Sequence, residues 1–279
     1  MIDLHTHSIF SDGSFTPEEL AVEARMAKLS AVALTDHDSV GGVDRFLTAC
    51  KEHGIRGVPG VEISVDHGTS SMHMLGYLID HHNRDLEKHL AKIGSARVCR
   101  NEMMLERLLK MGLALSMREV SDYAGGDNIG RLHFAQALVA RGYVKTRQEA
   151  FERFLARGKP GYADRSRLSP AQGIDMIREA GGLAVLAHPF TLALGKQALT
   201  ALVNDLVQSG LDGIEVYYPQ QTPKQMKYIR AIATKFKLEI TGGTDFHGAA
   251  MPEIQIGRGF GSLNVPDTVL EKLDERRRS

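Results

Sequence analysis

Seven short apolar segments recur along this chain, and helical stretches separate most of them. The segments cover residues 2–5, 31–36, 57–65, 72–79, 183–188, 213–218 and 238–245. The first intervening stretch opens with Thr16 as a capping residue, Pro17 suited to the first helical turn, and Glu18 near the positive end of the helix dipole. This alternation predicts an α/β protein in which helices surround a parallel sheet or barrel.

The alternation stops between residues 84 and 165. Residues 84–112 have the pattern of one long helix, shorter helical segments follow, and no strand pattern interrupts them. Residues 97–167 carry 14 Lys/Arg against 8 Asp/Glu, although the whole chain has no net charge. We expect a barrel formed by residues 1–83 and 166–279, with 84–165 as a small, basic helical insertion that caps the substrate. Charge alone leaves open whether these cations bind an anion or only solvate helix faces.

Composition excludes several classes of protein. At 279 residues, with 43% hydrophobic and 24% charged residues, the chain can form one large domain. It has no apolar run long enough to cross a bilayer, and its first residues lack the pattern of a signal peptide, so we expect a cytoplasmic protein without membrane contact. Zero net charge argues against binding long duplex nucleic acid. No protein partner is indicated. The two cysteines form no CxxC motif, so any metal must use nitrogen and oxygen ligands.

Histidines and acids recur in or just after the apolar segments. They are His5, His7, His37, Glu62, His73, His188, Asp245 and His247. The carboxyl ends of parallel strands meet on one face of a barrel, so we expect these side chains to lie close together. Carboxylates gathered in this way repel one another unless divalent cations bind between them. The pattern therefore predicts a metal centre.

The spacing within the first motif adds detail. His5 and His7 are two residues apart on an extended strand, so their rings can reach the same ion. Asp12 lies in the SDGS turn, where an aspartate can also simply stabilise the turn. Asp36 and Asp38 flank a histidine, and we expect them to orient its ring or to cap the next helix.

Six motifs in order resemble the polymerase and histidinol phosphatase family, known as the PHP domain. They are DLHTHSIFSDG, LTDHDS, the Glu62 segment, the His73 segment, AHP and GTDFH, between residues 3 and 247. The resemblance implies a distorted (β/α)7 barrel with a trinuclear metal centre and nine catalytic, metal-binding positions. By family analogy one ion takes His5, His7, Glu62 and Asp245, a second takes Glu62, His73 and His188, and a third takes Asp12, His37 and His247. Mixed imidazole and carboxylate ligands suit manganese, iron or zinc, and the family favours manganese.

The resemblance also implies the reaction. It points to hydrolysis of a phosphoester, and to a stand-alone branch containing nucleoside 3',5'-bisphosphate phosphatases and 5'-3' exoribonucleases that trim short RNA. A second phosphate needs cations away from the metals, and Arg binds phosphate well. The residues expected to contact substrate are Asp12, Arg97, Arg100, Asn101, Arg131, His133, Phe134 and His247, with Phe134 stacking on a base.

Three alternative functions remain open from the sequence alone. A histidinol-phosphate phosphatase would share the metal chemistry, but its cationic substrate favours an acidic second pocket rather than a basic insertion. A non-catalytic metal- or nucleotide-binding module would have disrupted metal motifs, whereas all nine positions are filled here. An amidohydrolase also begins with HxH but usually has a bridging lysine, and no lysine follows a predicted strand.

Overall fold

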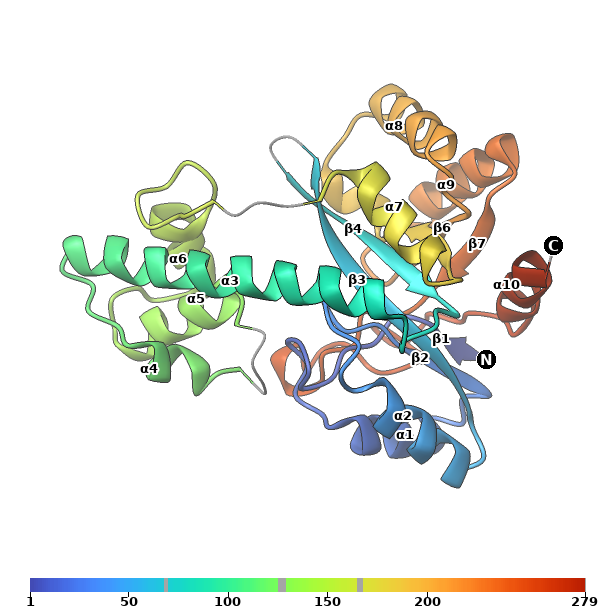
Figure 1. The fold of residues 1–279 in the computed structure, drawn as a ribbon, viewed down its shortest axis with the longest axis horizontal. Coiled ribbons are helices and arrows are strands. Elements are labelled where there is room, and N and C mark those ends of the chain that lie inside the picture. The colour runs from blue at the N-terminus through green and yellow to red at the C-terminus, as the bar shows by residue number, and fades with distance from the viewer. Residues whose placement is uncertain (68–69, 125–128, 165–167, 279) are drawn as a thin grey trace.

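The computed structural model describes residues 1–67, 70–124, 129–164 and 168–278 (Figure 1). Its strands are β1 (Ile2–Asp3), β2 (Ala31–Leu34), β3 (Arg56–His67), β4 (Ser70–Tyr77), β5 (Leu183–Leu186), β6 (Gly213–Tyr217) and β7 (Glu239–Gly242). Helices α1 (Pro17–Met26), α2 (Val43–Glu52), α7 (Pro170–Glu179), α8 (Lys196–Gln208), α9 (Pro223–Phe236) and α10 (Thr268–Arg278) accompany the strands. Between β4 and α7 lie α3 (Arg84–Lys110), α4 (Met117–Ser121), α5 (Arg131–Ala140), α6 (Arg147–Ala150) and the π-helix η1 (Phe151–Leu155). The short 3-10 helices are η2 (Pro189–Leu192) and η3 (Gly248–Ala250).

The seven strands form one sheet in chain order. Neighbouring strands are parallel from β1 to β3 and from β5 to β7, but β4 runs antiparallel to both β3 and β5. The barrel is as expected, but the parallel order that the alternation predicts is interrupted at β4. Only two residues separate β3 from β4, and a connection that short can join only antiparallel strands.

The two ends of the sheet meet just beyond the short strands β1 and β7. The amide of Leu4 donates to the carbonyl of Gly242 at 3.2 Å, and the amide of Asp245 donates to the carbonyl of His5 at 2.9 Å. These bonds bring the chain after the first strand beside the chain after the last one. The result is the nearly closed, seven-stranded α/β barrel that the motifs predicted.

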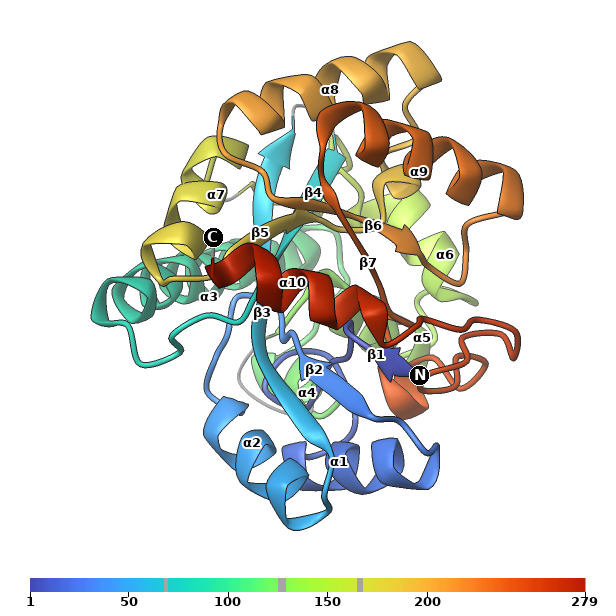
Figure 2. The same cartoon turned by 90° about the vertical axis from the view of Figure 1, so that its right-hand side faces the viewer.

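Apolar side chains fill the barrel and the layer around it. Leu4, Ala33 and Leu75 belong to the inner cluster, which Leu270 and Leu273 of α10 complete. Figure 2 shows α10 lying across the end of the barrel that is opposite the insertion. The other barrel helices pack outside the strands, and none of the described helices combines the length and apolarity that a membrane crossing requires.

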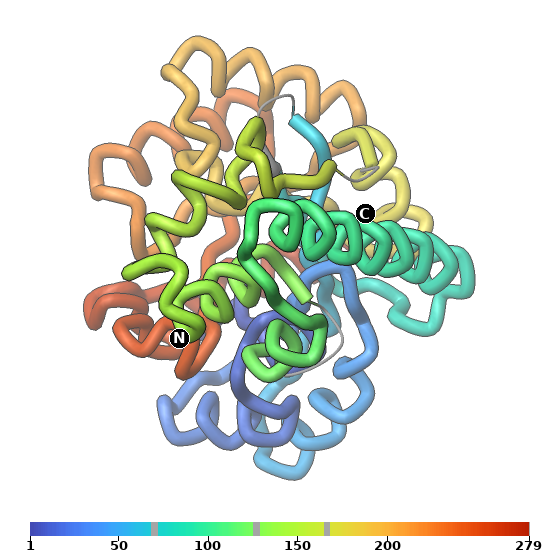
Figure 3. Tube along the Cα trace, turned by 90° about the vertical axis from the view of Figure 1, so that its left-hand side faces the viewer, coloured from blue at the N-terminus to red at the C-terminus, as the bar shows by residue number. Residues whose placement is uncertain are grey.

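The insertion forms a core of its own, and α3 belongs to two cores. Leu86 and Leu90, near its start, pack in the outer layer of the barrel, whereas Met104 and Leu108 pack with α5. The helix therefore begins at the expected boundary, residue 84, but its first half packs with the barrel rather than with the insertion. Figure 3 shows α3 to α6 in front of the barrel, on the side away from α10. No strand occurs among the described residues between 84 and 164.

Candidate metal centre

Polar side chains gather at the end of the barrel that faces the insertion. His5 and His7 follow β1, Asp12 lies in the next loop, His37 follows β2, Glu62 lies in β3, His73 lies in β4, His188 follows β5, and Asp245 and His247 follow β7. The structure brings all nine residues together, through the ion pairs described below. His73 reaches the cluster from the middle of a reversed strand rather than from a strand end.

Glu62 lies at the centre of the cluster and is fully buried. Its Oε2 atom is 3.4 Å from Nε2 of His5 and 3.3 Å from Nε2 of His7. Its Oε1 atom is 3.0 Å from Nδ1 of His73 and 3.1 Å from Nε2 of His188. The two oxygens thus face different histidines, as a carboxylate between two ions would.

Asp245 completes the first ligand group. Its Oδ1 atom is 3.3 Å from Nε2 of His5 and 3.1 Å from Nε2 of His7. Ligand atoms of these three residues and Glu62 all lie within 4.8 Å of one another. They are the four residues expected to hold one ion.

Asp12 belongs to another group on the insertion side. Its Oδ1 atom is 3.2 Å from Nε2 of His247, and its Oδ2 atom is 3.7 Å from Nε2 of His37. His7 lies close enough to join this group. His37 also lies within reach of Glu62, with 2.9 Å between Nδ1 and Oε2, so it can serve either group.

The unsatisfied polar atoms test whether this cluster fits a metal ion. Nε2 of His5, Nε2 of His7 and Oε2 of Glu62 are buried and form no hydrogen bond with the described residues. Leaving such atoms unsatisfied is costly, and a cation among them removes the cost. When four ligand atoms surround an ion tetrahedrally with bonds of 2.0–2.1 Å, neighbouring ligand atoms lie about 3.3 Å apart. Here the distances from the histidine nitrogens to the carboxylate oxygens are 3.1–3.4 Å, so the residues fit a divalent ion.

The model of the family described as "PHP domain" matches residues 3–169, more than half of the chain. The chain belongs to the PHP domain family. It is 35% identical to the 3',5'-nucleoside bisphosphate phosphatase of Chromobacterium violaceum over 254 residues, which cover 88% of this chain and 87% of the relative. It is 33% identical to the 5'-3' exoribonuclease Rnm of Escherichia coli over 258 residues, with 92% and 88% covered.

A solved structure from Chromobacterium violaceum, named an amidohydrolase and containing bound sulfate and no metal, superposes with a TM-score of 0.87. It is 32% identical, and the match covers 99% of this chain and 96% of that one. The likeness extends to the whole fold, including the insertion.

Protonation in this PHP centre follows from burial and from neighbouring charges. Burial lowers the pKa of His7 to about 4, and His247 adds to the effect. Burial alone would raise the pKa of Glu62, but His37 and His73 outweigh it and hold that pKa well below its usual value. At neutral pH His7 is therefore neutral and Glu62 ionised, the forms that bind metal.

Two other histidines hold protons before metal binds. Burial would lower the pKa of His37, but Glu62 and Asp12 raise it to about 10. Burial also opposes protonation of His247, yet Asp12 and Asp245 raise its pKa to about 9. Cations bound at these positions must displace those protons.

Asp36 and Asp38, on either side of His37, accept hydrogen bonds from residues of the PHP centre and its loops. Asp36 accepts hydrogen bonds from the amide of Ser8 at 2.8 Å and from the hydroxyl of Ser11 at 2.5 Å. Asp38 accepts from the amide of Ser64 at 2.8 Å. Asp36 thus holds the loop between His7 and Asp12.

Glu215 is a residue of the site that sequence reasoning missed. It is fully buried in β6, with Oε1 3.0 Å from Nδ1 of His5 and Oε2 accepting the amide of His188 at 2.7 Å. Tyr218 donates its hydroxyl to Oδ2 of Asp245 at 3.0 Å. The only available signal was an acid within an apolar segment, the same signal that singled out Glu62.

Two insertion residues reach the PHP centre. Arg97 of α3 forms an ion pair with Asp38, beside His37 of the candidate centre. His133 of α5 and Asp12 line the same hollow of about 350 Å³ between the insertion and the barrel. Arg100 lies one turn further along α3 and is buried.

Other expected substrate contacts lie inside the insertion. Phe134 is fully buried in the insertion core, so the expectation that it stacks on a base is wrong. Asn101 is also buried, and its Nδ2 donates to the carbonyl of Ile129 at 3.0 Å, which joins α3 to the start of α5. The guanidinium of Arg131 lies 5.5 Å from the ring centre of Tyr162.

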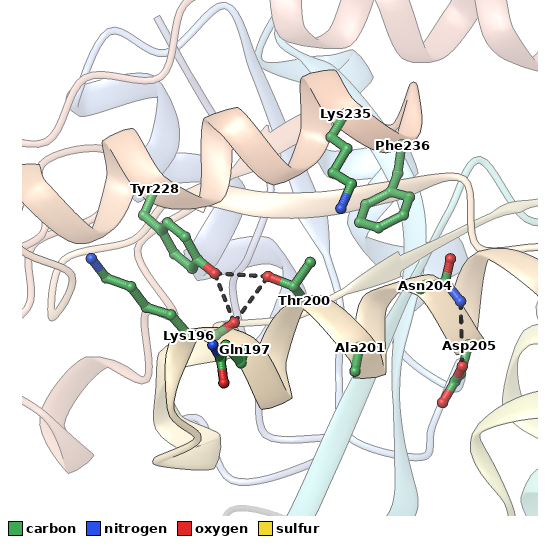
Figure 4. Close-up of a pocket in the computed structure, with 9 residues that line it drawn as sticks. All are labelled: Lys196, Gln197, Thr200, Ala201, Asn204, Asp205, Tyr228, Lys235 and Phe236. Carbon is green, nitrogen blue, oxygen red and sulfur yellow. Dashed lines mark hydrogen bonds between the residues drawn. The ribbon is translucent and has the colours of Figure 1, made fainter.

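A second hollow, of about 430 Å³, lies between α8 and α9 on the outside of the PHP barrel (Figure 4). The hydroxyl of Tyr228 lies 2.7 Å from Oγ1 of Thr200 and donates to the carbonyl of Lys196 at 2.7 Å. These groups satisfy one another and hold the two helices together. None of the nine clustered residues lines this hollow, so it is separate from the candidate centre.

Proposed function

We propose that this protein is a metal-dependent phosphoesterase that removes the 3'-phosphate of nucleoside 3',5'-bisphosphates and leaves a nucleoside 5'-monophosphate. The observation that carries the proposal is the gathering of nine histidines and carboxylates under a basic insertion. The names of two relatives support the substrate class. Manganese as the metal and a cytoplasmic location stay predictions.

The nine clustered residues would hold two or three divalent ions. Such ions lower the pKa of water and neutralise phosphoryl oxygens. Neutral His7 and ionised Glu62 are ready to bind at neutral pH. Glu215 accepts from His5 and from the backbone of His188, and so fixes the orientation of both.

The insertion would act as the cap that recognises substrate. The hollow lined by Asp12 and His133 opens beside the metal-binding groups. Arg97 lies on the same side, where its charge is shared with Asp38. A phosphate at the metals and a second one near Arg97 match a bisphosphate better than a cationic amine such as histidinol phosphate.

Short 5'-phosphorylated RNA is the second proposed substrate. The Escherichia coli relative is named a 5'-3' exoribonuclease, and in such RNA the 3'-oxygen of the first nucleotide carries a phosphodiester where the bisphosphate carries a monoester. A hydrolytic centre that accepts a bisphosphate can act on the end of such a chain.

The test is product analysis with manganese-loaded protein and three substrates: adenosine 3',5'-bisphosphate, histidinol phosphate and a short 5'-phosphorylated RNA. We expect adenosine 5'-monophosphate and phosphate from the first, mononucleotides from the third, and much slower release from histidinol phosphate. Faster release from histidinol phosphate would show that the substrate assignment is wrong. If none of the three substrates were hydrolysed, the proposal that the protein is a phosphoesterase would be wrong.

A further inference from the structure

A second cluster of histidine and carboxylate lies outside the barrel. Asp44 belongs to the first turn of α2, and His81 and His82 lie in the loop between β4 and α3. The Oδ1 atom of Asp44 is 2.9 Å from Nε2 of His81 and 3.3 Å from Nε2 of His82. None of these residues belongs to the PHP centre.

The geometry resembles that of the first metal group. Tetrahedral sites with bonds of 2.0–2.1 Å have ligand edges of about 3.3 Å. The two edges here are 2.9 and 3.3 Å, and the two imidazole rings have centroids 4.2 Å apart. All three ligand atoms thus converge on one small volume.

An ordinary surface ion pair explains this arrangement less well. Nε2 of His81 is hydrogen-bonded to Oδ1 of Asp44 at 2.9 Å, but the same oxygen also faces Nε2 of His82, and two charged imidazoles this close would repel each other. One divalent cation instead lets both rings bind through neutral nitrogens while the carboxylate balances its charge.

The backbone under the two histidines is held in place. Asp80 accepts the amide of His82 on its side chain at 3.1 Å and the amide of Asn83 on its carbonyl at 3.0 Å. Asn83 caps α3 and donates Nδ2 to the carbonyl of Glu179 at 3.2 Å. Ligand binding would therefore need only side-chain adjustment, which limits its entropic cost.

We propose that Asp44, His81 and His82 form a separate site for a divalent transition-metal ion of the zinc type, with water completing the coordination. The two-histidine, one-carboxylate set suits zinc, nickel or copper better than magnesium or calcium. An ion bound there ties α2 to the loop that leads into α3, the helix that carries Arg97 to the PHP centre.

Carbethoxylation of histidines, followed by peptide mass spectrometry with and without added zinc, tests this site separately from the centre. The side chain of His82 is 65% exposed, so it should react readily in metal-free protein. We expect zinc to protect His82 in the wild type and to protect it much less in Asp44→Asn. His53 is exposed and belongs to neither cluster, so its reaction should not change with zinc.

A second measurement counts the ions. Equilibrium dialysis against zinc should show one ion fewer per chain in His81→Ala/His82→Ala than in the wild type, while His53→Ala retains the wild-type content. Equal zinc content in the double variant and the wild type, or equal carbethoxylation of His82 with and without zinc, would overturn the proposal. Both readouts are independent of hydrolysis, so they stand or fall separately from the proposed activity.

Discussion

At the scale of single residues, the centre depends on two buried glutamates, one on β3 and one on β6. Glu62 faces the histidines that would hold the ions, and Glu215 lies behind His5. The sequence predicted Glu62 because a buried acid needs a partner and because it stands within a family motif. Glu215 has the same local pattern, but its partner is 210 residues away, and no local spacing reveals that contact.

Removing the charge of Glu215 should weaken metal binding without removing a ligand. We expect Glu215→Gln to lower metal affinity by about 10- to 100-fold, because His5 loses the group that orients its ring and raises its basicity. Competition with a chelator measures the affinity. Glu239→Gln, on the neighbouring strand β7 and outside the cluster, should bind metal like the wild type. Equal affinities in the two variants would exclude a positioning role.

Metal binding should release protons at neutral pH. His37 and His247 have pKa values of about 10 and 9 in the metal-free centre, and both are therefore protonated at pH 7. Affinity should rise with pH up to about pH 10 and then level off, because above the pKa of His37 few protons remain to be displaced. Calorimetry in buffers of different ionisation enthalpy counts the protons. We expect at least two per loaded chain; no release would contradict the protonation of these histidines.

At the scale of elements, α3 links the barrel to the insertion. The sequence predicted one long helix over 84–112, and the observed helix covers Arg84–Lys110. It did not predict that the first half packs on the barrel, because a helical pattern shows an apolar face but not the element that covers it. The reversal of β4 was missed for a similar reason, since alternation alone does not give strand direction.

The burial of Phe134 predicts that this residue stabilises the insertion. We expect Phe134→Ala to reduce the free energy of unfolding by about 3–5 kcal/mol, because the truncation leaves a cavity in a fully buried cluster. Leu109→Ala, at an exposed position of α3, should change it by less than about 0.5 kcal/mol. Denaturant unfolding followed by circular dichroism compares the two. Similar values would contradict a core role for Phe134.

At the scale of the whole molecule, the two ends of the sequence meet at the centre. His5 follows the first strand and Asp245 the last, and their backbones are joined by a hydrogen bond of 2.9 Å. The motifs were sufficient to predict this meeting, because the ends of a barrel's sheet are neighbours. The placement of Arg97 against Asp38, across the boundary between insertion and barrel, could not be predicted, since it depends on how the two cores pack.

The central claim is that the clustered residues bind the ions that make hydrolysis possible. Glu62→Gln tests it most directly, because Glu62 contacts five histidines of the cluster and glutamine has nearly the same shape. The measurement is manganese content per chain together with the rate of phosphate release from adenosine 3',5'-bisphosphate, after circular dichroism has shown a native fold. We predict fewer bound ions and a rate lowered by more than about 100-fold. Full manganese content with an unchanged rate would contradict the account.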